Sequence, residues 1–303
     1  MILKKDLLRV EFGTIRITHK GTEADVGFGR QGPIIPKETA KLVFDPTAIE
    51  GLEDVPGFRR NKTDRPISHG TFLENGRAES RIISMTGHAF AANASTLHQL
   101  RSTLAQHLNT GGFRQFKFDF SGGTRYAIGS CDSGLTWTQE LDHYAKWKFD
   151  VYCPDPRLYG NWKEYTMRSN DLDRTGYEFL SSFPASFTRD LDAPKTPVVQ
   201  NKGNSEAYPV FTLDANTSGF KITNGAGRSI AFSGTTRKGS PVTIDTFTGR
   251  ASVGGSDRSY SLTSRNWFTV PPGGSIRPTV DFVASPNIEA DLSILVKLRD
   301  TWI

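Results

Sequence analysis

The chain has 303 residues, of which 36% are hydrophobic and 23% are charged, and its formal net charge is +5. With 29 glycines this is the composition of an ordinary globular protein, which excludes a largely disordered or fibrous chain and predicts about two domains. The longest basic cluster is only Arg59, Arg60 and Lys62, so sequence-specific nucleic-acid binding is not expected.

The first residues do not have the pattern of an export signal or a membrane span. Lys4, Asp6 and Arg9 interrupt residues 1–12, and no stretch of the chain approaches 18 apolar residues. We therefore expect a protein that is made in the cytoplasm and does not enter a membrane. In that reducing compartment Cys131 and Cys153 are expected to remain free thiols.

The N-terminal part shows the alternation that is typical of strands. Residues 8–12 alternate apolar and charged side chains, and residues 15–17 resume in the opposite phase, which predicts a bulge or tight turn between two strands. Residues 41–66 hold one short apolar run followed by prolines, glycines and charges, and are predicted to be a long exposed loop. Strand alternation returns at 67–73 and 81–86.

One amphipathic helix is predicted at about residues 95–109. Asn93 or Ser95 would be its N-cap, and Gly111 and Gly112 would end it. Its apolar positions recur at spacings of three and four residues on a single face, at Leu97, Leu100, Leu104 and Leu108.

A hairpin and a longer strand follow the helix. Residues 116–128 alternate on both sides of a Ser-Gly-Gly turn, and in residues 145–153 the odd positions are apolar while the even ones are mostly polar. Residues 1–155 are thus predicted to be a β-rich domain with one helix packed against it.

The remainder is predicted to be a connection followed by a β-sandwich. Residues 156–195 hold few periodic apolar positions and read as a linker or arm. Residues 196–303 contain nine short apolar runs separated by turn residues, without a helix signal. These expected strands are 198–200, 208–213, 220–223, 229–232, 242–245, 251–253, 267–270, 280–283 and 292–298.

No motif predicts catalysis, a metal site or a cofactor. Gly27, Gly29 and Gly32 have the spacing of a dinucleotide fingerprint, but Pro33 and Pro36 stand where its helix would have to run. The six histidines are scattered, and no hydrolase or phosphate-loop motif occurs. The sequence therefore favours a structural or binding protein that is not an enzyme.

Aromatic residues of the second half are the candidates for a contact site. Tyr208, Tyr260 and Trp267 could stack on a sugar, although a sandwich core has an equal claim on such side chains. We expect Trp267 to lie mostly in the core and Tyr260 to be the better candidate for an exposed glycan or partner contact.

Five blocks of the sequence resemble, in the expected order, the distal tail proteins of phages with long non-contractile tails, and in particular their actinobacterial-phage branch. Residues 41–66 and 160–195 carry no part of this resemblance. The blocks are 147–159 (WKFDVYCPDPRLY), 201–213 (NKGNSEAYPVFTL), 242–251 (VTIDTFTGRA), 267–275 (WFTVPPGGS) and 296–302 (VKLRDTW).

The resemblance implies a structural protein of the virion, located at the tail tip. Its N-terminal half would form a ring of six copies, and its C-terminal half would be a galectin-like or carbohydrate-module-like jelly roll. The implied partners are the tail tube protein, the distal hub protein and the tape-measure protein, and no catalytic residue is implied.

A second hypothesis remains open at this point: a stand-alone carbohydrate-binding protein that recognises a bacterial surface glycan. The oligomeric state distinguishes the two hypotheses, because only the first requires a ring. Under the first, ring formation is expected from residues 1 to about 155, while residues from about 196 onwards would fold alone as a monomer.

Overall fold

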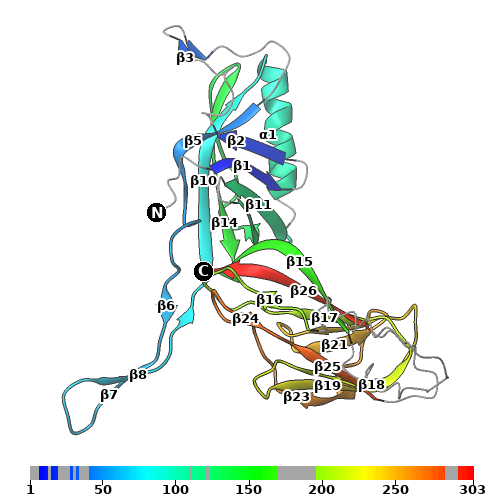
Figure 1. Ribbon diagram of the computed structural model, residues 1–303. Coiled ribbons are helices and arrows are strands. Elements are labelled where there is room, and N and C mark those ends of the chain that lie inside the picture. The colour runs from blue at the N-terminus through cyan, green and yellow to red at the C-terminus, as the bar shows by residue number, and fades with distance from the viewer. Residues whose placement is uncertain are drawn as a thin grey trace, which may run out of the picture. The chain divides into compact units, whose positions relative to one another are not determined.

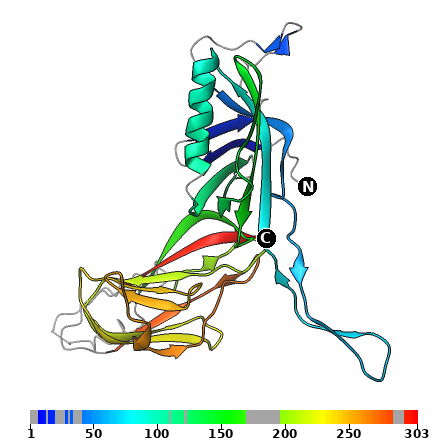
Figure 2. The same ribbon diagram turned by 180° about the vertical axis from the view of Figure 1, so that it is seen from behind.

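The computed structural model describes residues 41–108, 111–120, 123–168, 196–283 and 293–303, together with the strand backbones at 7–12, 15–19, 28–29 and 32–33. The chain divides into two compact units, residues 1–160 with Ile303 and residues 161–302, and each is described by itself. Strands dominate both units (Figures 1 and 2), which confirms the predicted mainly β class.

Seven strands of the first unit form a closed sheet, which we call the barrel. In order around the sheet they are β14 (Tyr144–Cys153), β10 (Arg81–Phe90), β5 (Lys41–Glu50), β2 (Ile15–His19), β1 (Leu7–Phe12), β11 (Arg114–Phe120) and β12 (Gly123–Cys131). The circle closes because β12 pairs with β14 again, where Cys131 lies opposite Val151. A further strand, β13 (Thr136–Leu141), pairs with β14. All of these pairings are antiparallel except that between β2 and β5. Closure leaves few exposed strand edges in this unit.

The alternation of apolar and polar residues along β14 decides which of its side chains are buried, as predicted. Its odd residues, from Ala145 to Cys153, are all buried, while the even ones are exposed or half-buried. Its partner β10 buries Ile83 and Met85, and Met85 lies opposite Phe149. The two strands predicted at the N-terminus pair antiparallel, with Phe12 opposite Ile15, and the predicted bulge or turn at residues 13–14 lies outside the described residues.

The predicted helix is α1 (Ala94–Leu108), which packs beside β10. Asn93 caps it, because its Oδ1 accepts hydrogen bonds from the Thr96 backbone N–H at 2.9 Å and from the Thr96 hydroxyl at 3.0 Å. The buried face carries Leu97, Leu104 and Leu108. These residues confirm the helix and select Asn93 between the two caps that the sequence allowed.

The prediction of a long exposed loop over 41–66 is wrong at the start of this range, whereas residues 57–66 are exposed as expected. Its first ten residues are β5, which lies between β10 and β2 in the closed sheet. The β5–β10 register shifts between the pairs Phe44↔Gly87 and Ile49↔Met85, a bulge that contains Pro46. Because proline cannot donate a ladder hydrogen bond, this interruption hides the strand pattern in the sequence.

The chain between β5 and β10 forms a two-stranded projection, residues 55–80, which we call the arm. Near the barrel, β6 (Phe58–Arg59) pairs with β9 (Arg77–Ala78), and further out β7 (Lys62–Asp64) pairs with β8 (Thr71–Leu73). Figures 1 and 2 both show the arm extending away from the barrel strands. The expected strand at 67–73 is thus present only over its last three residues.

The glycine fingerprint segment adopts a strand pair. There, β3 (Phe28–Gly29) pairs antiparallel with β4 (Gly32–Pro33), so that Gly29 lies opposite Gly32. A helix N-terminus directly behind these glycines, which dinucleotide binding requires, is incompatible with this pairing.

The second unit is a sandwich of two sheets. One sheet runs in the order β15 (Leu158–Arg168), β26 (Ser293–Trp302), β17 (Val210–Leu213), β20 (Val242–Asp245), β21 (Arg250–Val253) and β22 (Ser256–Asp257). The other runs β23 (Leu262–Arg265), β19 (Ser229–Thr236), β18 (Thr217–Thr223) and β25 (Thr279–Phe282). A short pair, β16 (Val199–Gln200) with β24 (Ser275–Ile276), and a 3-10 turn, η3 (Ser259–Ser261), complete it.

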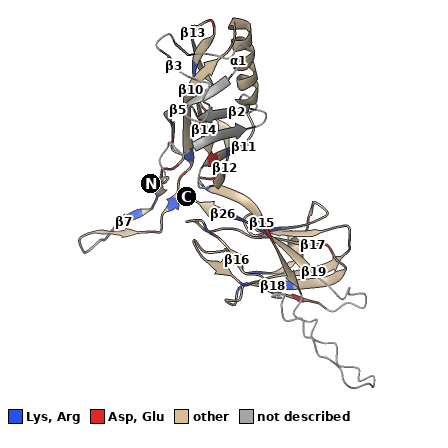
Figure 3. Cartoon of the chain, turned by 45° about the horizontal axis from the view of Figure 1, so that its top comes forward, with Lys and Arg blue, Asp and Glu red and all other residues tan. Residues whose placement is uncertain are grey.

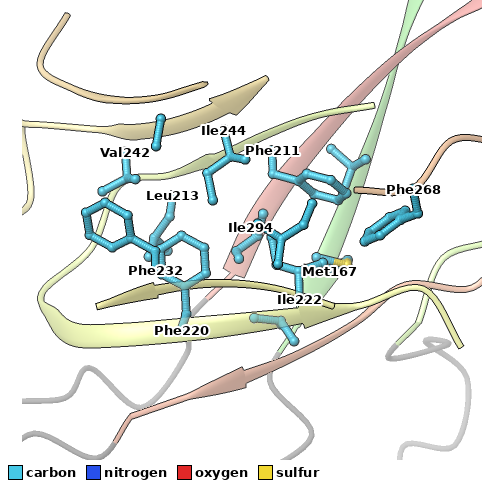
Figure 4. Close-up of a cluster of buried hydrophobic side chains, with 14 of the residues drawn as sticks. Met167, Phe211, Leu213, Phe220, Ile222, Phe232, Val242, Ile244, Phe268 and Ile294 are labelled. Atoms are coloured by element: carbon cyan, nitrogen blue, oxygen red, sulfur yellow. The ribbon is translucent and has the colours of Figure 1, made fainter. Parts of the chain in front are cut away.

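The core of this unit lies between the two sheets (Figure 4). Phe211, Ile244 and Ile294 enter it from the first sheet, and Phe220 and Phe232 enter it from the second, where their rings stack at 5.7 Å. Each such side chain contributes about 1.5–3 kcal/mol by leaving water. Aromatic and branched residues at alternate strand positions therefore hold the sandwich together.

The strand predictions in this half need correction, because one predicted strand is absent and β15, β22, β23 and β24 were not predicted. Residues 267–270 do not form a strand; Val270 makes only an isolated bridge with Ala207. The sequence missed β23, because only Leu262 of its four residues is buried and no alternation is visible. It also missed β15, which occupies part of the expected connection, because the exposed Trp162 breaks the apolar alternation there.

Candidate interaction surfaces

The arm is the most exposed part of the described chain. Every side chain from residue 57 to residue 75 is exposed, including the apolar Ile67 at 97% and Phe72 at 59%. The Arg60 guanidinium lies 5.7 Å from the Phe58 ring centre, and that of Arg65 lies 5.1 Å from the Phe72 ring centre. A thin projection that carries apolar and cationic side chains into water has the features of a protein-binding element.

Arg81 fixes the root of the arm. Its side chain is 4% exposed, and its guanidinium donates hydrogen bonds to four backbone carbonyls, those of Gly51, Leu52, Asp54 and Pro156, at 2.6 to 2.9 Å. Burial lowers the pKa of Arg81 below its ordinary value, but the nearby Asp54 opposes this shift. Sequence reasoning missed this residue, because an arginine at the start of a strand gives no sign of such a role.

Of the two predicted contact residues, Tyr260 precedes β23 in the sequence and Trp267 follows it, and their side chains differ in exposure. Tyr260, in η3, is 70% exposed, and Arg258 donates a hydrogen bond to its hydroxyl. Trp267 is half-buried and packs against the sandwich core, with its indole beside Gly249. No interaction joins the two side chains among the described residues, so the structure does not bring them into one site. A glycan or partner contact at either residue stays a prediction.

Two open depressions lie on the second unit. One, of about 460 Å³, is lined by Arg228 and Arg277 together with Asn224, Phe268 and neighbouring residues. The other, of about 320 Å³, lies over β20, β21 and β22 and is lined by the polar residues Thr243, Asp245, Thr248, Arg250, Ser252 and Asp257.

The described residues offer no metal-binding cluster. No group of three His, Cys, Asp or Glu side chains within the described ranges is arranged to hold a metal ion. None of the helices described is both long and apolar enough to cross a membrane. Basic and acidic residues are interspersed along the described chain (Figure 3).

The two cysteines are free, as predicted. Cys153 is fully buried on β14, and burial raises its pKa to about 11. Cys131 is partly exposed, and burial raises its pKa as well. Because the thiolate is the reactive form, both groups are protonated and slow to react at neutral pH.

We therefore expect a disulfide reagent to modify Cys131 first and Cys153 only after unfolding or at strongly alkaline pH. Timed thiol titration at pH 8, with and without denaturant, checks this order. Two thiols should be counted in the unfolded, non-reduced protein, and a count of zero would contradict the expectation.

The comparisons with known proteins point to phage tails. Residues 202–284 match the family model described as the C-terminal domain of the siphovirus-type tail component. The comparison with curated proteins finds no relative of the chain. Among solved structures, the crystal structure of phage SPP1 Dit, described as a paradigm of the hub adsorption apparatus in phages that infect Gram-positive bacteria, matches with a TM-score of 0.60. Its identity is 12%, and the match covers 88% of this chain and all of that one.

Two structures of the phage P2 baseplate in its activated conformation are also similar. The form with Ca gives a TM-score of 0.47 at 10% identity and covers 90% of this chain and 94% of that chain. The form with Sr gives a TM-score of 0.45 at 10% identity and covers 88% of this chain and 94% of that chain.

The matched region lies within the second unit, and the fold shared with SPP1 Dit extends over most of the chain. Both findings agree with the resemblance carried by the five sequence blocks. Residues 202–284 therefore match the C-terminal domain of the siphovirus-type tail component, and the chain shares the fold of SPP1 Dit.

Proposed function

We propose that this protein forms a ring of six copies that joins the tail tube to the distal hub of the tail tip. In this role it contacts the tail tube protein above and the hub protein below, surrounds the tape-measure protein, and performs no catalysis. The shared fold with SPP1 Dit, which is described as a paradigm of the hub adsorption apparatus, supports the role.

The observation that carries the proposal is the arm. Its two strand pairs comprise two and three residues per strand, and an isolated hairpin of this size is at best marginally stable in water. Its apolar side chains, Phe58, Ile67, Phe72 and Leu73, gain nothing from exposure. In the assembled state we expect a neighbouring copy to cover them.

A ring follows from the shape of such a contact. An arm that docks on a different surface of the next copy makes a head-to-tail contact, and repeated head-to-tail contacts close when the same rotation recurs. Six copies of 33.5 kDa have a mass of about 200 kDa. A single class of contact at the arm is therefore sufficient to build the ring.

Replacing Phe72 by aspartate is expected to dissociate the ring. A buried aromatic anchor at an interface is worth about 2 kcal/mol or more, roughly a 30-fold change in each contact, and a ring has several such contacts. Light scattering over a range of protein concentrations should find about 200 kDa for the parent protein and a shift towards 33.5 kDa for Phe72→Asp.

Phe113→Asp is the matched control, because Phe113 is an exposed phenylalanine of the same unit outside the arm, at 65% against 59%. It should leave the ring intact. A parent protein that stays monomeric at every concentration, or a ring that tolerates Phe72→Asp, would contradict the proposal.

A further inference from the structure

The outer face of β20, β21 and β22 presents a set of polar side chains. In the strand register Thr243 lies opposite Ser252, and Asp245 lies opposite Arg250. Ser252 in turn lies opposite Asp257. Their chain neighbours Val242, Ile244 and Ala251 are buried in the core, and side chains alternate between faces, so this set shares the solvent side. Together they line the depression of about 320 Å³.

Two carboxylates of this depression are held in fixed positions. Asp245 Oδ1 accepts hydrogen bonds from the backbone N–H groups of Phe247 at 2.8 Å and Thr248 at 3.4 Å. Asp257 Oδ1 accepts from the Ser259 backbone N–H at 2.8 Å and from the Ser259 hydroxyl at 2.6 Å. These bonds leave Oδ2 of both carboxylates without a hydrogen bond within the described residues.

The guanidinium of Arg250 is also available to a ligand. Among the described residues it makes neither a hydrogen bond nor a salt bridge, although it lies opposite Asp245 in the strand register and lines the same depression as Asp257. The hydroxyl residues Thr243 and Ser252 lie opposite each other in the register and line the same depression. The depression thus offers planar donors, planar acceptors and hydroxyls within a small area.

An exposed aromatic ring follows Asp245 in the chain, outside the lining of the depression. Phe247 follows Asp245 in the turn between β20 and β21, and its ring is 52% exposed. The ring packs edge to face against Tyr208, with their centres 5.2 Å apart. The Phe247 backbone is tied to Asp245 by its N–H bond to Oδ1, and the Tyr208 contact orients the ring.

We propose that this depression is a binding site for a neutral saccharide. Carboxylates and guanidinium groups can each hydrogen-bond two neighbouring hydroxyls of a sugar, and an aromatic ring can cover the apolar face of a sugar ring. An anionic ligand is disfavoured, because one arginine faces two aspartates. The volume lies at the lower end of the roughly 300–1,000 Å³ range of ligand sites. The site involves neither the arm nor any residue of the ring proposal, so each can fail without the other.

The test is direct binding of uncharged sugars to the full chain. Glucose, galactose, N-acetylglucosamine, rhamnose and their linear trisaccharides serve as probes in saturation-transfer NMR and calorimetric titration. At least one probe should bind saturably with a dissociation constant on the order of 1 mM or below, as expected for a small open site. Arg250→Gln and Asp257→Asn should each weaken that binding about tenfold, the effect of losing one or two hydrogen bonds to a charged group.

Arg277→Gln is the matched control, because it removes an exposed arginine that lines the other depression of the same unit. It should leave saccharide binding unchanged. Asp257→Asn keeps the acceptor Oδ1 that receives the Ser259 hydrogen bonds, and an unchanged melting temperature would show that each variant folds. Failure of every probe to bind, binding only of anionic sugars, or loss of binding in Arg277→Gln but not in Arg250→Gln would each overturn the proposal.

Discussion

Replacing Arg81 by methionine is expected to lower the free energy of unfolding of the first unit by about 3–5 kcal/mol, because a buried network of charge-assisted hydrogen bonds is lost. Methionine fills a similar volume but donates nothing, and the carbonyls of Gly51, Leu52, Asp54 and Pro156 then lose their shared donor. Urea unfolding measures the global effect. Hydrogen exchange over residues 49–56 shows whether the loss is centred on the root of the arm.

Two further variants distinguish the effect of losing the Arg81 hydrogen bonds from the effect of losing its positive charge. Arg81→Lys keeps a cation but has one donor nitrogen, which cannot reach four carbonyls spread over two segments, so a substantial part of the loss should remain. Arg77→Met, in the exposed part of the arm, should change stability by less than about 0.5 kcal/mol. Equal stability of Arg81→Met and the parent protein would refute the anchoring role. Because Arg81 fixes the direction in which the arm leaves the barrel, its loss should also weaken ring formation.

The regular parts of this fold could be predicted from the sequence because their signals are periodic and local. The alternation of residues 145–153 predicts the buried face of β14, and the leucine spacing predicts α1. By contrast, β5 is interrupted by Pro46 and β23 has a single buried residue, so neither strand shows a regular alternation of apolar and polar residues in the sequence. A strand without this alternation can still be stabilised by the strands that pair with it, and such a strand is recognised only in the folded structure.

The candidate sites were less predictable for the same reason. Tyr260 was found because an aromatic residue stands out in a sequence, and it is exposed as expected. The depression over β20–β22 depends on Asp245 and Asp257, which lie on different strands and become neighbours only through the register of β21. The function of Arg81 depends on residues 27 to 75 positions away along the chain. Contacts between residues so far apart in the chain cannot be predicted from the spacing of residues in a single sequence.

Replacing Asn201 by aspartate is expected to destabilise the second unit by about 2–4 kcal/mol, because a buried donor set becomes a buried negative charge. Asn201 is fully buried. Its Oδ1 accepts hydrogen bonds from the backbone N–H groups of Gly203 at 2.9 Å and Thr301 at 3.2 Å. Its Nδ2 donates to the carbonyl of Ser205 at 2.6 Å and reaches those of Val270 and Pro271 at 3.3–3.4 Å.

An aspartate keeps the accepting oxygen but turns the other one towards three carbonyl oxygens, so repulsion replaces attraction. The shape is nearly unchanged, and the effect therefore reports hydrogen bonding rather than packing. Asn224→Asp is the matched control, because Asn224 uses only Oδ1, which accepts from the backbone N–H groups of Ala226 and Arg228. Urea unfolding at neutral pH should separate the two variants clearly. At acid pH the difference between Asn201→Asp and the parent protein should narrow, since a protonated carboxyl can again donate one hydrogen bond. If both variants unfold like the parent protein at neutral pH, Asn201 does not hold the start of the sandwich to its last strand.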